Sequence, residues 1–253
     1  MKTPFRIRPS IVLFGDSITE QAFGFKGPDF PPIEFGWASL LAADYSRRAD
    51  VLSRGFSGYT TRHAVNMLPR IFPGPPQEPC LFCTVFFGAN DAALPGELQH
   101  VPVEEYGQNL VKIVNHIRTA FESTSFPILL ITPPPFDAEA WMSHKGFDTP
   151  GRDNQVAKTY GDKVKQVAVG LEMCSVVDTW TLMEGSSDNI SKYLSDGLHL
   201  NEAGNRLVHK GIMDALAKDF PNVLPMLDGE GRNGESGVPL EEPPWRELFS
   251  GND

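Results

Sequence analysis

The sequence of 253 residues is poor in cysteine and in basic residues. Three cysteines are a small and odd number, which suits a reducing compartment with free thiols better than a disulfide framework. Lysine and arginine number 22 against 32 acidic residues, so the net charge is −10. Binding to nucleic acid or to an anionic membrane surface needs clustered basic residues, and this balance therefore argues against both kinds of partner.

Long apolar runs are also missing, and none approaches the roughly 18 residues of a membrane-spanning helix. The basic N-terminal segment is followed by a short apolar run, Ile11 to Phe14, which is shorter than the core of a secretory signal. We therefore expect a cytoplasmic protein without a membrane span. No serine lies in a G-x-S-x-G motif, which disfavours the α/β-hydrolase fold, and no P-loop motif is present.

With 41% hydrophobic residues the chain is expected to be globular, and strands alternate with helices along it. Buried-type strands are predicted at residues 11–14, 51–52, 81–87, 128–132 and 175–177. Helices are predicted at residues 37–48, from Thr60 or Thr61 to near Pro69, and at 103–121, 153–171 and 201–220, with loops at 21–35 and 137–150. This alternation predicts an α/β three-layer sandwich whose five-stranded parallel sheet is covered on both faces.

The last part of the chain has a different composition. From about Asn222 it is rich in Gly, Pro and acidic residues. We therefore expect one α/β domain over residues 1–220 and an acidic tail over 221–253. Three apolar side chains could dock the tail: Trp245, Leu248 and Phe249.

Ser17 is the first candidate for catalysis. It follows the apolar run Ile11 to Phe14 in a predicted turn, Gly15-Asp16-Ser17. Ligands gather at the carboxyl ends of strands in open α/β sheets, and a serine there is a candidate nucleophile if a histidine reaches it. A short motif of this kind is nevertheless more often structural than catalytic.

Three later positions could complete such a site. Asp196 lies three residues before His199, so its carboxylate could orient the imidazole as a base; a surface aspartate and histidine is the alternative. Asn90 ends the strongest predicted strand and could donate its side-chain N–H to an oxyanion, although asparagine is also a common turn former. Gly58 is either a turn glycine or a backbone N–H donor to the same oxyanion.

Taken together, these four blocks resemble the SGNH hydrolases, also called the GDSL esterase family. The resemblance covers residues 9–220, including the spacing of the blocks, and is greatest to the isoamyl acetate-hydrolysing esterase group. The runs that carry it are Phe14-Gly15-Asp16-Ser17-Ile18-Thr19-Glu20, Arg54-Gly55-Phe56-Ser57-Gly58-Tyr59, Val85-Phe86-Phe87-Gly88-Ala89-Asn90-Asp91-Ala92, Ile131-Thr132-Pro133-Pro134-Pro135 and Asp196-Gly197-Leu198-His199. The first block has isoleucine where the name-giving motif has leucine.

The resemblance implies a flavodoxin-like sheet of order 2-1-3-4-5 and no cofactor or metal. It also implies a serine esterase with Ser17 as nucleophile, His199 as base and Asp196 as its orienting acid. Ser17, Gly58 and Asn90 would form the oxyanion hole. The expected substrate is an acetate or other short-acyl ester of a small alcohol. A carbohydrate deacetylase, a thioesterase, a lysophospholipase and a non-catalytic binding module are the alternatives, and oligomeric state is not predicted.

Two other features have a structural interpretation. Cys80 and Cys83 form a C-x-x-C without a second such motif, at the start of an apolar strand, and we expect them to be structural thiols. The predicted loops near the site carry aromatic residues that could wall a pocket for an apolar alcohol or could simply pack the loops. They are Phe23, Phe25, Phe30, Phe35, Phe136, Trp141 and Phe147.

Overall fold

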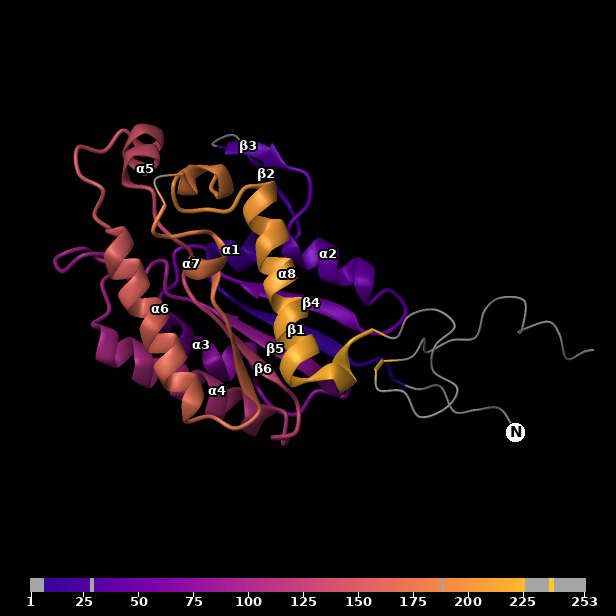
Figure 1. Cartoon of the computed structure of the whole chain (residues 1–253). Helices are drawn as coiled ribbons and strands as arrows, with labels where there is room; N and C mark the ends of the chain where they lie inside the picture. Colours follow the sequence, from indigo (N-terminus) through magenta and orange to yellow (C-terminus); the bar gives the residue numbers. More distant parts are fainter. Residues whose placement is uncertain (1–6, 28–29, 188, 226–236, 239–253) are drawn as a thin grey trace, which may run out of the picture.

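A parallel sheet of five strands forms the centre of the computed structural model, which describes residues 7–27, 30–187, 189–225 and 237–238. The strands are β1 (Ser10–Gly15), β4 (Asp50–Gly55), β5 (Cys80–Phe86), β6 (Ile128–Ile131) and β7 (Cys174–Val177). Their order is β4-β1-β5-β6-β7, and all neighbours are parallel (Figure 1). The predicted α/β class and the order 2-1-3-4-5 are therefore confirmed.

The sheet forms because its central strands are almost continuously apolar, as expected for strands buried on both faces. Every residue of β1 is buried, and its neighbours in register include the pairs Ile11–Val51 and Ile11–Phe82. Alternate residues of β1 enter two separate cores: Leu13 belongs to one and Phe14 to the other. The period of two in a strand thus places one hydrophobic core on each side of the sheet.

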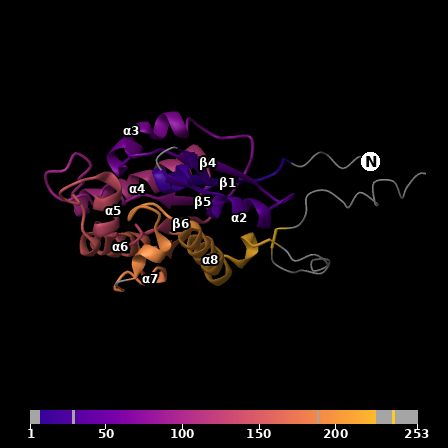
Figure 2. The ribbon, with the colours of Figure 1, turned by 90° about the horizontal axis from the view of Figure 1, so that it is seen from above.

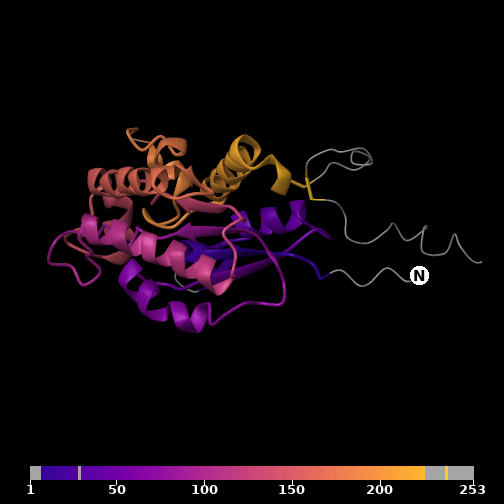
Figure 3. The same ribbon diagram turned by 90° about the horizontal axis from the view of Figure 1, so that it is seen from below.

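Helices cover both faces of the sheet, and Figures 2 and 3 show α3 and α8 on opposite sides of it. The first face carries α3 (Thr61–Ile71), α4 (Val103–Ala120) and α6 (Asn154–Val169), and the second carries α2 (Trp37–Asp44) and α8 (Glu202–Asp219). Asn201 caps α8 as predicted, because its side chain accepts from the Gly204 N–H at 3.1 Å. Pro69 lies in the last turns of α3, which ends two residues later.

Two segments predicted as loops contain regular structure. The first contains a hairpin of β2 (Phe25–Gly27) and β3 (Phe30–Ile33). The sequence of β3 contains two prolines, which fit because this strand pairs with a neighbour on one side only. The second contains α5 (Ala138–Lys145). Its start was signalled by Asp137, which accepts from the Ala140 N–H, and its end by Gly146 at φ 68°. Figure 1 shows both segments at the end of the molecule where α8 begins.

The described residues also form short helices: α1 (Ser17–Glu20), α7 (Thr179–Leu182), and the 3-10 turns η1 (Ile190–Tyr193) and η2 (Pro221–Val223). The predicted helix at 37–48 is shorter than expected, because α2 ends at Asp44 and Arg47 adopts φ 60°. Within the described ranges, no helix is long and apolar enough to cross a bilayer. Residues Trp245, Leu248 and Phe249, suggested to dock the tail, lie outside the described residues, and the division at residue 220 stays a prediction.

Candidate active site

Ser17 is the first residue of α1 and lies two residues after β1, at the carboxyl end of a central strand. The turn is held by Asp16, whose Oδ1 accepts from the Ile18 N–H at 3.0 Å. The fold therefore presents Ser17 at the edge of the sheet where α/β proteins bind ligands. Ser17 is only 7% exposed, so its hydroxyl lies in a largely desolvated position.

Asp196 and His199 come from a tight turn between η1 and α8. An antiparallel bridge between Leu194 and Leu200 closes this turn, and its Gly197 adopts φ 93°. A Cβ at Gly197 would lie 2.4 Å from the carbonyl oxygen of Asp137, so only glycine fits against the start of α5. The turn thereby brings the end of the domain back to Ser17, which is 182 positions earlier than His199.

The three side chains form a hydrogen-bonded chain. His199 Nε2 lies 2.9 Å from Ser17 Oγ, and His199 Nδ1 lies 2.8 Å from Asp196 Oδ2. Asp196 Oδ1 accepts from the backbone N–H groups of Leu198 and His199 at 2.9 and 2.7 Å. Burial opposes the ionisation of Asp196, but the hydrogen bonds from His199 and the backbone outweigh it and hold the pKa of Asp196 below its usual value.

The protonation state follows from this arrangement. An ionised carboxylate only accepts hydrogen bonds, so His199 Nδ1 carries the proton that Asp196 accepts. In a neutral imidazole the Nε2 atom is then an acceptor, and Ser17 Oγ–H donates to it. Such an arrangement can remove a proton from the serine hydroxyl while it attacks an electrophile.

Gly58 and Asn90, the other two predicted residues, line the same cleft as Ser17 and His199. Gly58 adopts φ 76°, a conformation that disfavours other residues. Asn90 lies just after β5 and is 4% exposed. Its Nδ2 donates to the Tyr59 carbonyl oxygen at 3.0 Å, which leaves its second N–H for another acceptor. The structure thus brings all five predicted site residues together, and their catalytic roles remain predictions.

The cleft above these residues has a volume of about 560 Å³. Its walls are formed by the hairpin, α5, the loops that follow α1, β4, β5 and α5, and the turn between η1 and α8. The lining residues are Gln21, Phe25, Ser57, Ala93, Glu97, Leu98, Gln99, Trp141, Lys145, Phe147, Arg152 and Leu198. Of the seven aromatic residues singled out in the sequence, Phe25, Trp141 and Phe147 line the cleft. Phe136 is buried and packs edge-on against Trp141, whereas Phe23 is exposed elsewhere.

Two polar residues of the cleft that form hydrogen bonds with predicted site residues were not found from the sequence. Arg152 donates to the Asn90 and Gln99 side chains, and Gln99 donates to the Gly58 carbonyl oxygen. Arg152 lies between the predicted loop 137–150 and the predicted helix at 153–171, and no motif marks it. Gln99 lies in a loop described only by its Pro and Gly content. No local sequence pattern marks either residue, because each forms its hydrogen bond with a residue more than 40 positions away.

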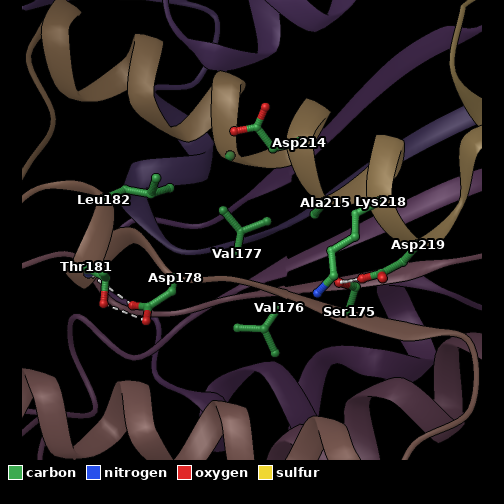
Figure 4. A pocket seen from close by; sticks show the side chains of 11 residues that line it. Ser175, Val176, Val177, Asp178, Thr181, Leu182, Asp214, Ala215, Lys218 and Asp219 are labelled. Carbon is green, nitrogen blue, oxygen red and sulfur yellow. Dashed lines mark hydrogen bonds between the residues drawn. The ribbon is translucent and has the colours of Figure 1, made fainter.

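A second hollow of about 260 Å³ lies along the edge strand β7 (Figure 4). Figure 4 shows Asp214, Ala215, Lys218 and Asp219 of α8 across from Ser175 and Val176 of β7. Ser175 Oγ donates to Asp219 at 2.6 Å, and the hollow contains none of the predicted site residues. We therefore assign the candidate site to the cleft at Ser17.

The other residues weighed in the sequence lie elsewhere. Cys80 and Cys83 are free thiols in β5, and burial raises the pKa of both well above the usual range. Thiols that resist ionisation are poor nucleophiles and metal ligands, which agrees with a structural role. Among the described residues no group of three or more His, Cys, Asp or Glu is arranged to hold a metal ion.

Two further carboxyl groups are buried next to the candidate nucleophile and to Asn90. Asp16 Oδ2 has no hydrogen-bond partner among the described residues. Asp91 Oδ1 accepts from the backbone N–H of Thr61 at 2.9 Å and from its hydroxyl at 2.5 Å. Burial raises the pKa of Asp16 and that of Asp91 to about 7, although their hydrogen bonds act in the opposite direction.

Replacement of Asp16 with asparagine should therefore change the pH dependence of stability. An aspartate in the unfolded chain titrates near pH 4, so the folded chain binds more protons between about pH 4 and 7. The free energy of unfolding then falls as pH rises through this window, by at most about 4 kcal/mol for each such carboxyl. Asp16→Asn keeps the acceptor for Ile18 and removes the ionisation. The free energy of unfolding of the variant minus that of wild type should therefore be larger at pH 8 than at pH 5.

Urea unfolding followed by tryptophan fluorescence at pH 5 and pH 8 measures this effect. The exposed Asp148 supplies the matched control, and Asp148→Asn should alter stability by the same small amount at both pH values. An equal effect of Asp16→Asn at both pH values would show that Asp16 is not protonated in the folded chain at pH 5.

Comparison with known proteins identifies the family of this chain. The model of the GDSL-like lipase/acylhydrolase family matches residues 13–207. A GDSL esterase/lipase of Arabidopsis thaliana is 44% identical over 80% of this chain and 83% of its own. The isoamyl acetate-hydrolyzing esterase 1 homologs of mouse and human are 40% and 38% identical, each over 95% of this chain and 88% of their own.

Solved structures show the same fold at lower identity. The lipase/acylhydrolase from Enterococcus faecalis superposes with a TM-score of 0.60 at 24% identity, and the match covers 82% of this chain and 95% of the other. An acetyl-xylooligosaccharide esterase from Geobacillus gives a TM-score of 0.59 at 19% identity, with 86% and 98% covered. From the family match and the relatives at 38–44% identity, this chain belongs to the GDSL-like lipase/acylhydrolase family and is a carboxylic ester hydrolase.

Proposed function

We propose that the chain hydrolyses short-acyl esters, above all acetates of small apolar alcohols, through an acyl-enzyme formed on Ser17. The observation that carries this proposal is the hydrogen-bonded chain Ser17–His199–Asp196 at the base of the cleft, with distances of 2.9 and 2.8 Å. A serine hydroxyl is a weak nucleophile at neutral pH, and an adjacent oriented base is what activates it.

In the first half of the reaction Ser17 Oγ attacks the ester carbonyl carbon while His199 Nε2 takes the hydroxyl proton. Asp196 holds the imidazole by its Nδ1–H and stabilises the imidazolium that forms. The tetrahedral intermediate then collapses, the C–O bond to the alcohol breaks, and His199 returns the proton to the leaving alcohol oxygen. In the second half a water molecule attacks the acyl-Ser17 by the same route and releases the carboxylic acid.

The negative charge on the carbonyl oxygen needs donors that are already in place. The Ser17 and Gly58 backbone N–H groups and the second N–H of Asn90 Nδ2 supply them in this mechanism. Asn90 and Ser17 are 4% and 7% exposed, so water competes little for these donors. Removal of one such donor costs on the order of 10²–10³ in kcat in serine hydrolases.

The substrate class rests on the cleft walls and on the relatives. Phe25, Leu98, Trp141 and Phe147 give the cleft apolar surface that suits a hydrocarbon alcohol portion. The mouse and human relatives are named for isoamyl acetate, an ester of acetic acid with a branched apolar alcohol. Both features favour an apolar alcohol over a sugar, and the names of the relatives favour a small acyl group over the long chains of a phospholipid.

A series of p-nitrophenyl esters from acetate to decanoate tests the acyl preference. The rate measured with the Ser17→Ala variant is subtracted as the background for each ester. We expect kcat/KM to be highest for acetate and to fall at least about tenfold by decanoate, since each misfit methylene costs about 1 kcal/mol or more in a tight pocket. Isoamyl acetate compared with an acetylated xylose then tests the alcohol. A rate that rises with acyl length would indicate a lysophospholipase, and a preference for the acetylated sugar would indicate a carbohydrate deacetylase.

A further inference from the structure

A ring of four hydrogen bonds joins the two oxyanion-hole residues that lie outside the Ser17 turn. The Gly58 carbonyl oxygen accepts from Gln99 Nε2 at 2.9 Å, and Gln99 Oε1 accepts from Arg152 Nη2 at 2.6 Å. The same Nη2 donates to Asn90 Oδ1 at 3.3 Å, and Asn90 Nδ2 donates to the Tyr59 carbonyl oxygen at 3.0 Å. Because Gly58 and Tyr59 are consecutive, the ring begins and ends on one short stretch of backbone.

Arg152 is itself held firmly from several directions. Its Nε donates to the Ala89 carbonyl oxygen at 3.2 Å, next to Asn90, and its guanidinium carbon lies 5.4 Å from the centre of the Trp141 ring. Its backbone forms an antiparallel bridge with Ala93, in the loop that follows β5. The guanidinium therefore meets Asn90 and Gln99 with little freedom to move, and a rigid planar fork is well suited to orient an amide.

The ring determines which way the Asn90 amide faces. The oxygen and the NH₂ of an amide have nearly the same shape, so only the partners decide its orientation. Arg152 can only donate and the Tyr59 carbonyl can only accept, which places Oδ1 toward Arg152 and Nδ2 toward Tyr59. The second N–H of Nδ2 is then available to an oxyanion, whereas a flipped amide would turn an oxygen lone pair toward the negative charge.

We propose that Arg152 and Gln99 are positioning residues of the oxyanion hole, which act by fixing the Asn90 amide and the Gly58 backbone rather than by touching substrate. This inference rests on the proposed function, because that function assigns Gly58 and Asn90 to the oxyanion. It predicts that loss of either residue slows the chemical step and leaves substrate binding nearly unchanged.

The test is a double-mutant cycle on p-nitrophenyl acetate that combines Arg152→Met with Asn90→Ala, together with Gln99→Leu as a single variant. Arg152→Met and Gln99→Leu should each lower kcat about tenfold to a hundredfold and change KM by no more than about twofold, since small misplacements of catalytic donors cost up to about 10². In the Asn90→Ala background, Arg152→Met should lower kcat by less than about threefold, because Asn90, its direct partner, is already lost and only its indirect contact with Gly58 through Gln99 remains.

Two variants separate positioning from charge and from general stability. Arg152→Lys keeps the positive charge but loses the fork, so it should restore little of the lost kcat. Arg62→Gln removes an exposed arginine that pairs with Glu105 outside the cleft, and its kcat should match wild type. If Arg152→Met does not fold, Gln99→Leu alone decides the question: a lowered kcat at unchanged KM supports positioning of Gly58, and a raised KM at unchanged kcat overturns it.

The outcomes also distinguish a failure of the positioning role from a failure of the proposed catalytic mechanism. Effects of Arg152→Met and Asn90→Ala that multiply fully, a raised KM at unchanged kcat, or full rescue by Arg152→Lys would each overturn the positioning role. If Ser17→Ala keeps its activity, or if Asn90→Ala leaves kcat unchanged, the proposed mechanism itself fails. An inactive Ser17→Ala and a slow Asn90→Ala with multiplying Arg152 effects would remove this inference alone.

Discussion

The Ser17→Ala variant should lose essentially all esterase activity, with kcat reduced on the order of 10⁶. In the proposed mechanism the change removes the attacking oxygen and therefore the acyl-enzyme route, while the proposed oxyanion donors and the cleft remain. Ser17 is 7% exposed and loses only its hydroxyl, so the variant should fold with nearly unchanged stability. Steady-state hydrolysis of p-nitrophenyl acetate measures the rate, and a thermal melt confirms the fold.

The matched control is Ser39→Ala, because the Ser39 hydroxyl donates to the Phe23 carbonyl oxygen away from the cleft lining. This variant should hydrolyse the ester at the wild-type rate. A folded Ser17→Ala protein that kept more than about a hundredth of the wild-type kcat would require a different nucleophile, since triad knockouts lose far more.

The His199→Ala variant should be nearly as inactive as Ser17→Ala, because the two residues act as one unit in a serine hydrolase. In the proposed mechanism His199 Nε2 is the group that removes the Ser17 proton and protonates the leaving alcohol, and the variant lacks it. Asp196→Asn should cost less, about 10⁴ in kcat, since it leaves the geometry but favours the wrong imidazole tautomer. The double variant Ser17→Ala/His199→Ala should be no slower than either single variant, which tests whether the two share one function.

His209 provides the control for this prediction. It also pairs with an aspartate, Asp44, at 2.7 Å, but it joins α8 to α2 away from the cleft. His209→Ala should keep wild-type kcat. If His209→Ala and His199→Ala lowered kcat equally, the activity would depend on general integrity of the α8 region rather than on a base at His199.

The parts of the site that the sequence predicts are those with local signals. Ser17 and Asn90 each lie three residues after an apolar run that is predicted to be a strand, and parallel strands bring their carboxyl ends to one edge. Asp196 and His199 are three residues apart, so their contact is a short-range one. Gly58 follows the short strand at the same edge. These signals place Ser17, Asn90 and Gly58 at one edge and Asp196 beside His199. That His199 meets Ser17, 182 positions away, was implied only by the resemblance of the four blocks to a known family.

The parts that sequence reasoning missed depend on long-range contacts or on overlooked caps. The bond from Arg152 to Asn90 spans 62 positions, and that from Arg152 to Gln99 spans 53 positions. No period or motif encodes such a contact, because it depends on how the loop after β5 lies against the start of α6. The helix α5 was missed for a different reason, since its signals, Asp137 and Gly146, lie at its two ends rather than in an apolar stripe.

The most direct test of the central claim is to trap the nucleophile with an organophosphate that reacts with activated serines. Full inactivation of the wild-type enzyme followed by peptide mass spectrometry should locate one phosphoryl group on Ser17, with activity lost in proportion to the label. Ser17→Ala should take up no label. A wild-type enzyme that is inactivated with the label on another residue, or that stays active and unlabelled while it hydrolyses esters, would contradict the account.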